Sequence, residues 1–249
     1  MRVVAVIPAR YQSSRFKGKP LELIEDEPMV AWVYGQVKQV RGLDDVYVAT
    51  DDDRIEKVCK EKNIKVILTK NTHPTSTERV QEVSETVKAD LYLVINGDEP
   101  LINPKMIEKI IPESLPDSNK VYVANLMTKI KNPVEAVDFT NIKVVFDKLS
   151  YAMFFSRSPI PYPKGSMDYD YYKHVGVLIY NKKALDFFAS TKKGPYEIVE
   201  DVNEIRFLEN GEKIKMVEVE SESLSVDTPK DLEHIRAIVK EKHLSCYHW

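Results

Sequence analysis

Short apolar runs alternate with amphipathic segments through the first 96 residues of the chain. Four runs have the length and the aliphatic composition of buried strands: 2–8, 44–50, 64–69 and 90–96. The segments between them carry apolar residues at helical spacing, at 28–40, 51–63 and 77–89. This alternation predicts a parallel sheet with helices on both faces.

The pattern changes after about residue 120, where strand-like runs follow one another without helices. These runs, at 120–130, 141–147 and 150–156, predict an antiparallel addition to the sheet. Beyond them we expect a strand at 172–181, helices at 182–190 and 197–211, a strand at 213–219, and a helix at 228–242 capped by Thr228. We expect the stretch 159–170, which is rich in Pro and Tyr, to be an ordered flap or a dimer-contact loop. No repeat or linker interrupts the chain, so we expect one domain over 1–249.

Charge and composition exclude several classes of protein. The net charge is −3, whereas general nucleic-acid binders carry a broad basic surface, so no nucleic-acid partner is expected. No apolar stretch approaches the roughly 20 residues that span a bilayer, so no membrane partner is expected. Cys59 and Cys246 lack metal-ligand spacing and fit a reducing compartment, which predicts a cytoplasmic protein.

Positive charge is concentrated in the loop that follows the first predicted strand. Arg10, Arg15 and Lys19 lie there with Ser14 and Gly18, at the edge of the sheet where open α/β proteins bind ligands. Backbone N–H groups and these side chains suit phosphate oxygens, although a solvated basic loop is the alternative. The Walker A and dinucleotide glycine patterns are both absent.

Two acidic motifs follow other predicted strands. Asp98 and Glu99, in NGDEP (96–100), come directly after the strand at 90–96, where a carboxylate can hold Mg²⁺ together with ligand phosphates. Asp227, in SVDTPKDL (225–232), follows the late strand; taken alone it is an ordinary residue before a helix. Together Asp98 and Asp227 could bracket one metal–phosphate unit.

Two further signals are weaker. TSTER (75–79) precedes a predicted helix, where Thr77 is the expected cap, or where hydroxyls and backbone could meet a nucleobase edge. His174 lies on the predicted strand 172–181 and could face the same crevice, whereas the other histidines are scattered. No Ser–His–Asp arrangement is evident.

In their order along the chain, these motifs resemble those of the 3-deoxy-manno-octulosonate cytidylyltransferase (CMP-Kdo synthetase) family. The matching segments are IPARYQSSRFKGKPL, VATDDDRI, TSTERV, NGDEPLI, YAMFFSRSPIPY, KHVGVLIY and SVDTPKDLEHIR. The resemblance implies transfer of CMP from CTP to the anomeric hydroxyl of an acidic ulosonic sugar, with release of pyrophosphate. It also implies a Rossmann-like nucleotide-diphospho-sugar transferase fold, with a mixed, mostly parallel sheet and an antiparallel excursion that forms a homodimer.

The resemblance also assigns roles to individual residues. It implies that the triphosphate is bound by Arg10, Ser14, Arg15 and Lys19, and that Mg²⁺ is held by Asp98 and Asp227. The catalytic set is then Arg10, Arg15, Lys19, Asp98 and Asp227. The cytosine side is implied for Ser76, Thr77 and Arg79, and nucleotide contact also for Asn96 and Asp98. The sugar side is implied for Arg157, His174, Glu200, Asn203 and Glu204.

Three segments depart from the family pattern and keep alternatives open. The family usually reads QGDEP, SGTER and ESLEQLR where this chain has NGDEP, TSTER and EDVNEIR. Glu204 in place of glutamine suits an acceptor that offers an amine or an extra hydroxyl donor, which makes 8-amino-3,8-dideoxy-manno-octulosonate an alternative acceptor. Another acceptor or nucleotide is the alternative; a non-catalytic nucleotide-binding regulator and an NAD-dependent oxidoreductase are disfavoured.

Overall fold

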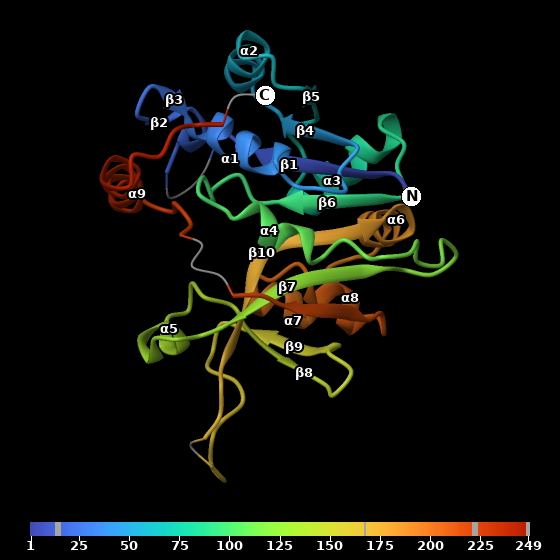
Figure 1. The fold of residues 1–249 in the computed structure, drawn as a ribbon. Helices are drawn as coiled ribbons and strands as arrows, with labels where there is room; N and C mark the ends of the chain where they lie inside the picture. The colour runs from blue at the N-terminus through green and yellow to red at the C-terminus, as the bar shows by residue number, and fades with distance from the viewer. Residues whose placement is uncertain (13–15, 167, 221–223, 248–249) are drawn as a thin grey trace.

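A twisted central sheet organises the chain in the computed structural model, which describes residues 1–12, 16–166, 168–220 and 224–247 (Figure 1). Its strands are β1 (Val3–Ala9), β4 (Asp45–Thr50), β5 (Val66–Leu68), β6 (Leu91–Ile95), β7 (Val123–Lys129), β8 (Lys143–Phe146), β9 (Ala152–Ser156), β10 (Tyr172–Asn181) and β11 (Ile214–Glu218). The main order is β11-β7-β10-β6-β1-β4-β5. Strands β6, β1, β4 and β5 are parallel, and β10 runs antiparallel to both β6 and β7. The predicted mostly parallel sheet is confirmed.

Helices cover both faces of the sheet, as predicted. They are α1 (Met29–Lys38), α2 (Asp53–Glu61), α3 (Ser76–Thr86), α4 (Pro104–Glu108), α5 (Pro133–Val137), α6 (Lys182–Ser190), α7 (Pro195–Glu200), α8 (Ile205–Glu209) and α9 (Pro229–Glu241). Alternate residues of β1 serve the two faces: Val3 and Ile7 pack with α1, α4 and α9, while Val4 and Val6 pack with α3, α6 and α8. A strand buried on both faces must be apolar throughout, which explains the continuous run in β1.

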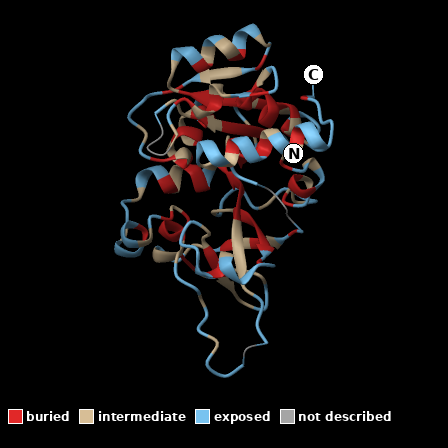
Figure 2. Cartoon of the chain, turned by 90° about the vertical axis from the view of Figure 1, so that its left-hand side faces the viewer, coloured by how far each residue is buried: buried red, intermediate tan, exposed pale blue. Residues whose placement is uncertain are grey.

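The antiparallel addition predicted after residue 120 is also present. β8 and β9 pair antiparallel, and β8 continues onto the first half of β10. The segment between β9 and β10 extends away from the body of the protein (Figure 1). Figure 2 shows that buried residues concentrate in the sheet and on parts of its covering helices, whereas this extension is largely exposed.

Two local predictions were wrong. Thr77 does not cap α3: Thr75 does, because its hydroxyl accepts from the Glu78 N–H while the Glu78 side chain accepts from the Thr75 N–H. The helix expected at 197–211 is interrupted between α7 and α8. Asp201 takes a left-handed conformation there (φ 51°), and its carbonyl accepts a hydrogen bond from Arg157, a residue distant in sequence.

The last helix, α9, and the chain that follows it are fixed by specific contacts. Thr228 caps α9 as predicted, in a capping box with Asp231. The chain after α9 packs on α1, where a Cβ added at Gly35 would lie only 2.6 Å from the Tyr247 carbonyl oxygen. Among the described residues, no helix is long and apolar enough to cross a bilayer. The single domain expected over 1–249 remains a prediction.

Candidate active site

Three residues far apart in sequence meet at the carboxyl edge of the sheet. The Lys19 ammonium lies 3.0 Å from Asp98 Oδ2 and 3.9 Å from Asp227 Oδ1, and it donates a 2.7 Å hydrogen bond to the Val226 carbonyl. The Val226 N–H in turn donates to the Asp98 carbonyl at 2.8 Å. The loop after β1, the loop after β6 and the segment before α9 are thereby joined at one point.

This arrangement suits a magnesium ion that shares its ligands with a nucleotide. Asp98 and Asp227 already converge on one cationic group, the Lys19 ammonium. In the described part of the chain, no cluster of three or more His, Cys, Asp or Glu side chains is placed to form a complete protein cage. Mg²⁺ commonly takes one or two carboxylates together with substrate phosphates, so the donor set fits that use.

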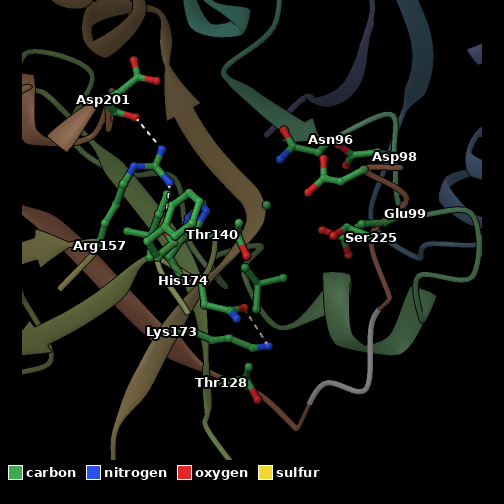
Figure 3. A pocket seen from close by; sticks show the side chains of 16 residues that line it. Asn96, Asp98, Glu99, Thr128, Thr140, Arg157, Lys173, His174, Asp201 and Ser225 are labelled. Carbon is green, nitrogen blue, oxygen red and sulfur yellow. Dashed lines mark hydrogen bonds between the residues drawn. The ribbon is translucent and has the colours of Figure 1, made fainter. Parts of the chain in front are cut away.

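Two cavities open on either side of Asp98. The first, here called the loop cavity, has a volume of about 480 Å³ and is lined by Arg10, Gln12, Lys19, Ser76, Lys193 and Asn203, among others. The second, the β10 cavity, has a volume of about 630 Å³ and is lined by Phe139–Ile142, Arg157, Lys173, His174 and Asp227, among others (Figure 3). Asn96, Asp98 and Asp201 line both. The cavities therefore adjoin at these three residues.

Arg157 is anchored on one side of the β10 cavity by backbone oxygens. Its guanidinium donates to the carbonyls of Glu200 (2.6 Å), Asp201 (3.0 Å) and Phe139 (3.1 Å). Carbonyl oxygens fix the plane of the guanidinium without neutralising its charge. The charge consequently remains available to an anionic ligand.

His174 lies opposite Asn96 and Asp98 across the same cavity (Figure 3). It is partly buried, and its Nδ1, which is shielded from solvent, has no hydrogen-bond partner among the described residues. Burial, with the nearby charges of Arg157 and Lys173, lowers the pKa of His174 to about 4. The imidazole is therefore neutral near pH 7 and can offer a hydrogen bond to a bound ligand.

A family model described as cytidylyltransferase matches residues 4–214. The chain belongs to the cytidylyltransferase family. It is 38% identical over 245 residues to a 3-deoxy-manno-octulosonate cytidylyltransferase of Fusobacterium nucleatum, covering 98% of this chain and 99% of the relative. It is 40% identical to an 8-amino-3,8-dideoxy-manno-octulosonate cytidylyltransferase of Shewanella baltica, covering 93% and 96%.

The fold agrees with a solved structure of this family. A CMP:2-keto-3-deoxy-manno-octonic acid synthetase complexed with CTP superposes with a TM-score of 0.91 at 38% identity, covering 97% of this chain and 100% of that one. The family resemblance and the fold class inferred from the motifs are confirmed. The protein is a nucleotidyltransferase.

Several residues assigned to the cytidylyltransferase site line its cavities, and others do not. Arg10, Lys19, Ser76, Asn96 and Asp98 line the loop cavity, where Asn203, expected on the sugar side, also lies. Arg157, His174 and Asp227 line the β10 cavity. Ser14 and Arg15 lie outside the described residues.

The remaining assigned residues have structural partners beneath the cavities. Arg79 is fully buried and donates to Asp51 Oδ2 at 2.7 Å and to the Thr69 hydroxyl. Thr77 is buried within the first turn of α3. Glu200 accepts from the Ser156 hydroxyl (2.7 Å) and from the Arg157 N–H (2.8 Å), so its carboxylate supports the strand that carries Arg157.

The sequence motifs missed two cavity residues. Lys193 lines the loop cavity and lies in no motif, whereas Lys173 lines the β10 cavity at the start of the KHVGVLIY segment, where only His174 was assigned a role. Lys143 was also missed. It is fully buried and donates to the carbonyls of Asp138, Asn141 (2.7 Å) and Arg157, which holds the 138–142 segment against the end of β9. A lysine within an apolar strand gives no local signal of this role.

Glu204 is the clearest case for a pH-dependent effect on stability. It is only 7% exposed and lines neither cavity. Burial, and then the neighbouring carboxylate of Glu197, raises the pKa of Glu204 from 4.5 to about 7. The folded protein therefore binds this proton more tightly than the unfolded chain does. The stabilisation is complete below pH 4.5 and is lost as the pH rises through 7.

We expect Glu204→Gln to be more stable than the wild type at pH 8, by on the order of 3 kcal/mol, and equal to it near pH 4.5. The glutamine keeps the shape of the side chain but cannot ionise. Urea denaturation of both proteins across this pH range measures the difference. A difference independent of pH would contradict the ionisation of a buried Glu204.

Proposed function

We propose that the protein transfers CMP from CTP to the anomeric hydroxyl of an acidic 3-deoxy ulosonic sugar and releases pyrophosphate. The observation that carries this proposal is the meeting of two cavities at Asn96 and Asp98. One contains the basic loop residues Arg10 and Lys19, and the other contains Arg157 beside a neutral His174. The names of the relatives, which act on 3-deoxy-manno-octulosonate or its 8-amino analogue, support this acceptor class.

In the proposed reaction the loop cavity holds CTP and the β10 cavity holds the sugar. Arg10 and Lys19 bind triphosphate oxygens and stabilise the charge that collects on the departing pyrophosphate. The anomeric hydroxyl gives its proton to solvent and its oxygen bonds to the α-phosphorus, while the bond from that phosphorus to the bridging oxygen breaks and its electron pair leaves with pyrophosphate. Holding both reactants at one junction removes much of the entropic cost of their meeting.

Asp98 and Asp227 would hold Mg²⁺ at the junction of the cavities. When bound, Mg²⁺ would polarise phosphate oxygens and make the attacking hydroxyl more acidic. Arg157 binds the sugar carboxylate, because its guanidinium keeps its charge while three carbonyls fix its orientation. His174 offers its unpaired Nδ1 to a sugar hydroxyl.

The proposal is tested by incubating the purified protein with Mg²⁺ and each of the four nucleoside triphosphates, against a panel of ulosonic acids. Product mass and pyrophosphate release are measured together. We expect a CMP–sugar adduct with CTP and a 3-deoxy ulosonic acid. Turnover only with another nucleotide, or only with an acceptor of another class, would overturn the proposal.

We further propose that two copies associate through the antiparallel excursion. Large apolar side chains are exposed on it and on the adjoining helix α7: Val137 on α5, Met153 on β9, Tyr162 in the extension and Val199 on α7. An edge-on contact between Phe154 and Tyr196 joins β9 to α7. Exposed apolar patches of this kind are typical of protein interfaces.

Light scattering on the purified protein should give twice the mass of one chain. Met153→Lys/Val199→Lys should shift the protein towards the single-chain mass, since it places charges in the apolar surface. A wild-type mass of one chain at micromolar concentration would contradict the dimer. We place the enzyme in the cytoplasm, where its two free, buried cysteines would stay reduced.

A further inference from the structure

Asp201 stands where the two cavities meet. Together with Asn96 and Asp98, Asp201 lines both cavities, and it is exposed to solvent. Within the described ranges its carboxylate has neither a hydrogen bond nor an ion pair; the contacts of the residue are made by its backbone. Figure 3 shows its backbone oxygen turned to the Arg157 guanidinium while its carboxylate points away from that bond.

The backbone of Asp201 is fixed by contacts that do not involve this carboxylate. Its N–H donates to the Glu197 carbonyl at 2.9 Å and ends α7, and its carbonyl accepts from Arg157 Nη2 at 3.0 Å. The left-handed conformation (φ 51°) is one that aspartate and asparagine tolerate better than most residues. The carboxylate is thus held at the junction by structure that survives its replacement.

The charges around it show what such a carboxylate can bind. Lys19 is engaged by Asp98 and Asp227, and Lys173 is paired with Glu135. The Arg157 guanidinium faces carbonyls and the cavity. An acceptor with only a carboxylate and hydroxyls would meet an unpaired negative charge at Asp201, whereas an acceptor that also carries an ammonium group would neutralise it.

We propose that Asp201 binds an ammonium group of the acceptor and makes the enzyme select an amino-substituted ulosonic acid over its hydroxyl counterpart. This inference rests on the proposed function, because it requires the sugar to occupy the β10 cavity. It replaces the sequence-based assignment of the amine to Glu204, which lines neither cavity. Asp201 lies in the same segment, 200–206, whose sequence departs from the family pattern. Nothing in the sequence distinguishes Asp201 from its neighbours there.

The test compares two acceptors with the full-length enzyme, CTP and Mg²⁺: 3-deoxy-manno-octulosonate and 8-amino-3,8-dideoxy-manno-octulosonate. We expect the wild type to favour the amino sugar in kcat/KM by at least about tenfold, the value of one charge-assisted contact. Asp201→Asn should lower this preference at least about fivefold, through a higher KM for the amino sugar. Its kcat/KM for the hydroxyl sugar should be unchanged or raised.

Two variants serve as controls for folding and position. Asp201→Gly removes the carboxylate and relieves the left-handed backbone, so it should lose the preference as Asp201→Asn does. Glu204→Gln should keep the wild-type ratio, because that side chain is buried outside both cavities.

The outcomes separate the two proposals. A wild-type enzyme that converts the sugars equally well, or a ratio unchanged in both Asp201 variants, overturns the role of Asp201 and leaves the proposed function standing. Absence of a CMP adduct with either sugar overturns both the proposed function and this inference.

Discussion

Asp98→Asn should lower the rate of pyrophosphate release at saturating CTP by at least about 100-fold, the usual loss when one charge-stabilising group is removed from a reaction centre. Asp98 lines both cavities, and its carboxylate lies 3.0 Å from the Lys19 ammonium. Asparagine keeps the size of the side chain but loses the charge that would hold Mg²⁺. The rate is measured by a coupled pyrophosphate assay over a range of Mg²⁺ concentrations.

The loss should come from chemistry and not from unfolding. The melting temperature of Asp98→Asn should stay within a few degrees of the wild type, because the carboxylate is partly exposed. Asp26→Asn, which changes an exposed carboxylate between β2 (Leu23–Ile24) and β3 (Glu27–Pro28), is the matched control and should retain full activity. A rate for Asp98→Asn within tenfold of the wild type would show that Asp98 does not hold the metal, as would turnover that survives chelation with EDTA.

Arg206→Met should lower the free energy of unfolding by about 3–5 kcal/mol, the typical cost of leaving one member of a buried ion pair alone. Arg206 and Glu197 are 2% and 1% exposed, and two hydrogen bonds of 2.7 and 2.6 Å join them. The guanidinium also donates to the Phe188 carbonyl at 2.9 Å and lies over the Phe188 ring. Removing it leaves the buried Glu197 carboxylate with the more distant Lys193 ammonium, 3.9 Å away, as its remaining ion-pair partner among the described residues.

Denaturant titrations at pH 7 measure this effect, with Lys57→Met as the control. Lys57 and Glu61 form an exposed ion pair on α2, with Nζ and Oε1 3.9 Å apart. Loss of this pair should lower the free energy of unfolding by less than about 1 kcal/mol. The double variant Arg206→Met/Glu197→Leu should recover much of the stability, because an apolar pair carries no desolvation penalty. If Arg206→Met unfolds within 1 kcal/mol of the wild type, the pair contributes no more than its exposed counterpart.

The sequence predicted features that depend on neighbouring residues, and missed those that depend on distant ones. The apolar period of β1 and the Thr228 cap are local, and both are confirmed. The cap of α3 was placed two residues late, because TSTER offers several hydroxyls and only the reciprocal bond with Glu78 selects Thr75. Asp201 interrupts the expected helix at 197–211 because its carbonyl meets Arg157, a residue 44 positions away.

The candidate site was predictable to the same extent. Strand ends place Lys19 and Asp98 at one edge of a parallel sheet, which is a topological consequence of the βαβ order. Arg79 was assigned to the nucleotide because it lies in a motif, but its burial against Asp51 depends on the packing of α3 behind β4. Lys143 and Lys193 belong to no motif, and only tertiary structure brings them to the site.

The bond from Lys19 to the Val226 carbonyl spans 207 residues. During synthesis the first strands leave the ribosome well before this partner is made, at roughly 5–20 residues per second. The nascent chain can therefore assemble β1, β4, β5 and β6 while Lys19 still lacks one of the groups that hold it. We expect nascent chains arrested before residue 226 to collapse around the parallel strands yet remain inactive. Catalytic competence is thus acquired late in translation.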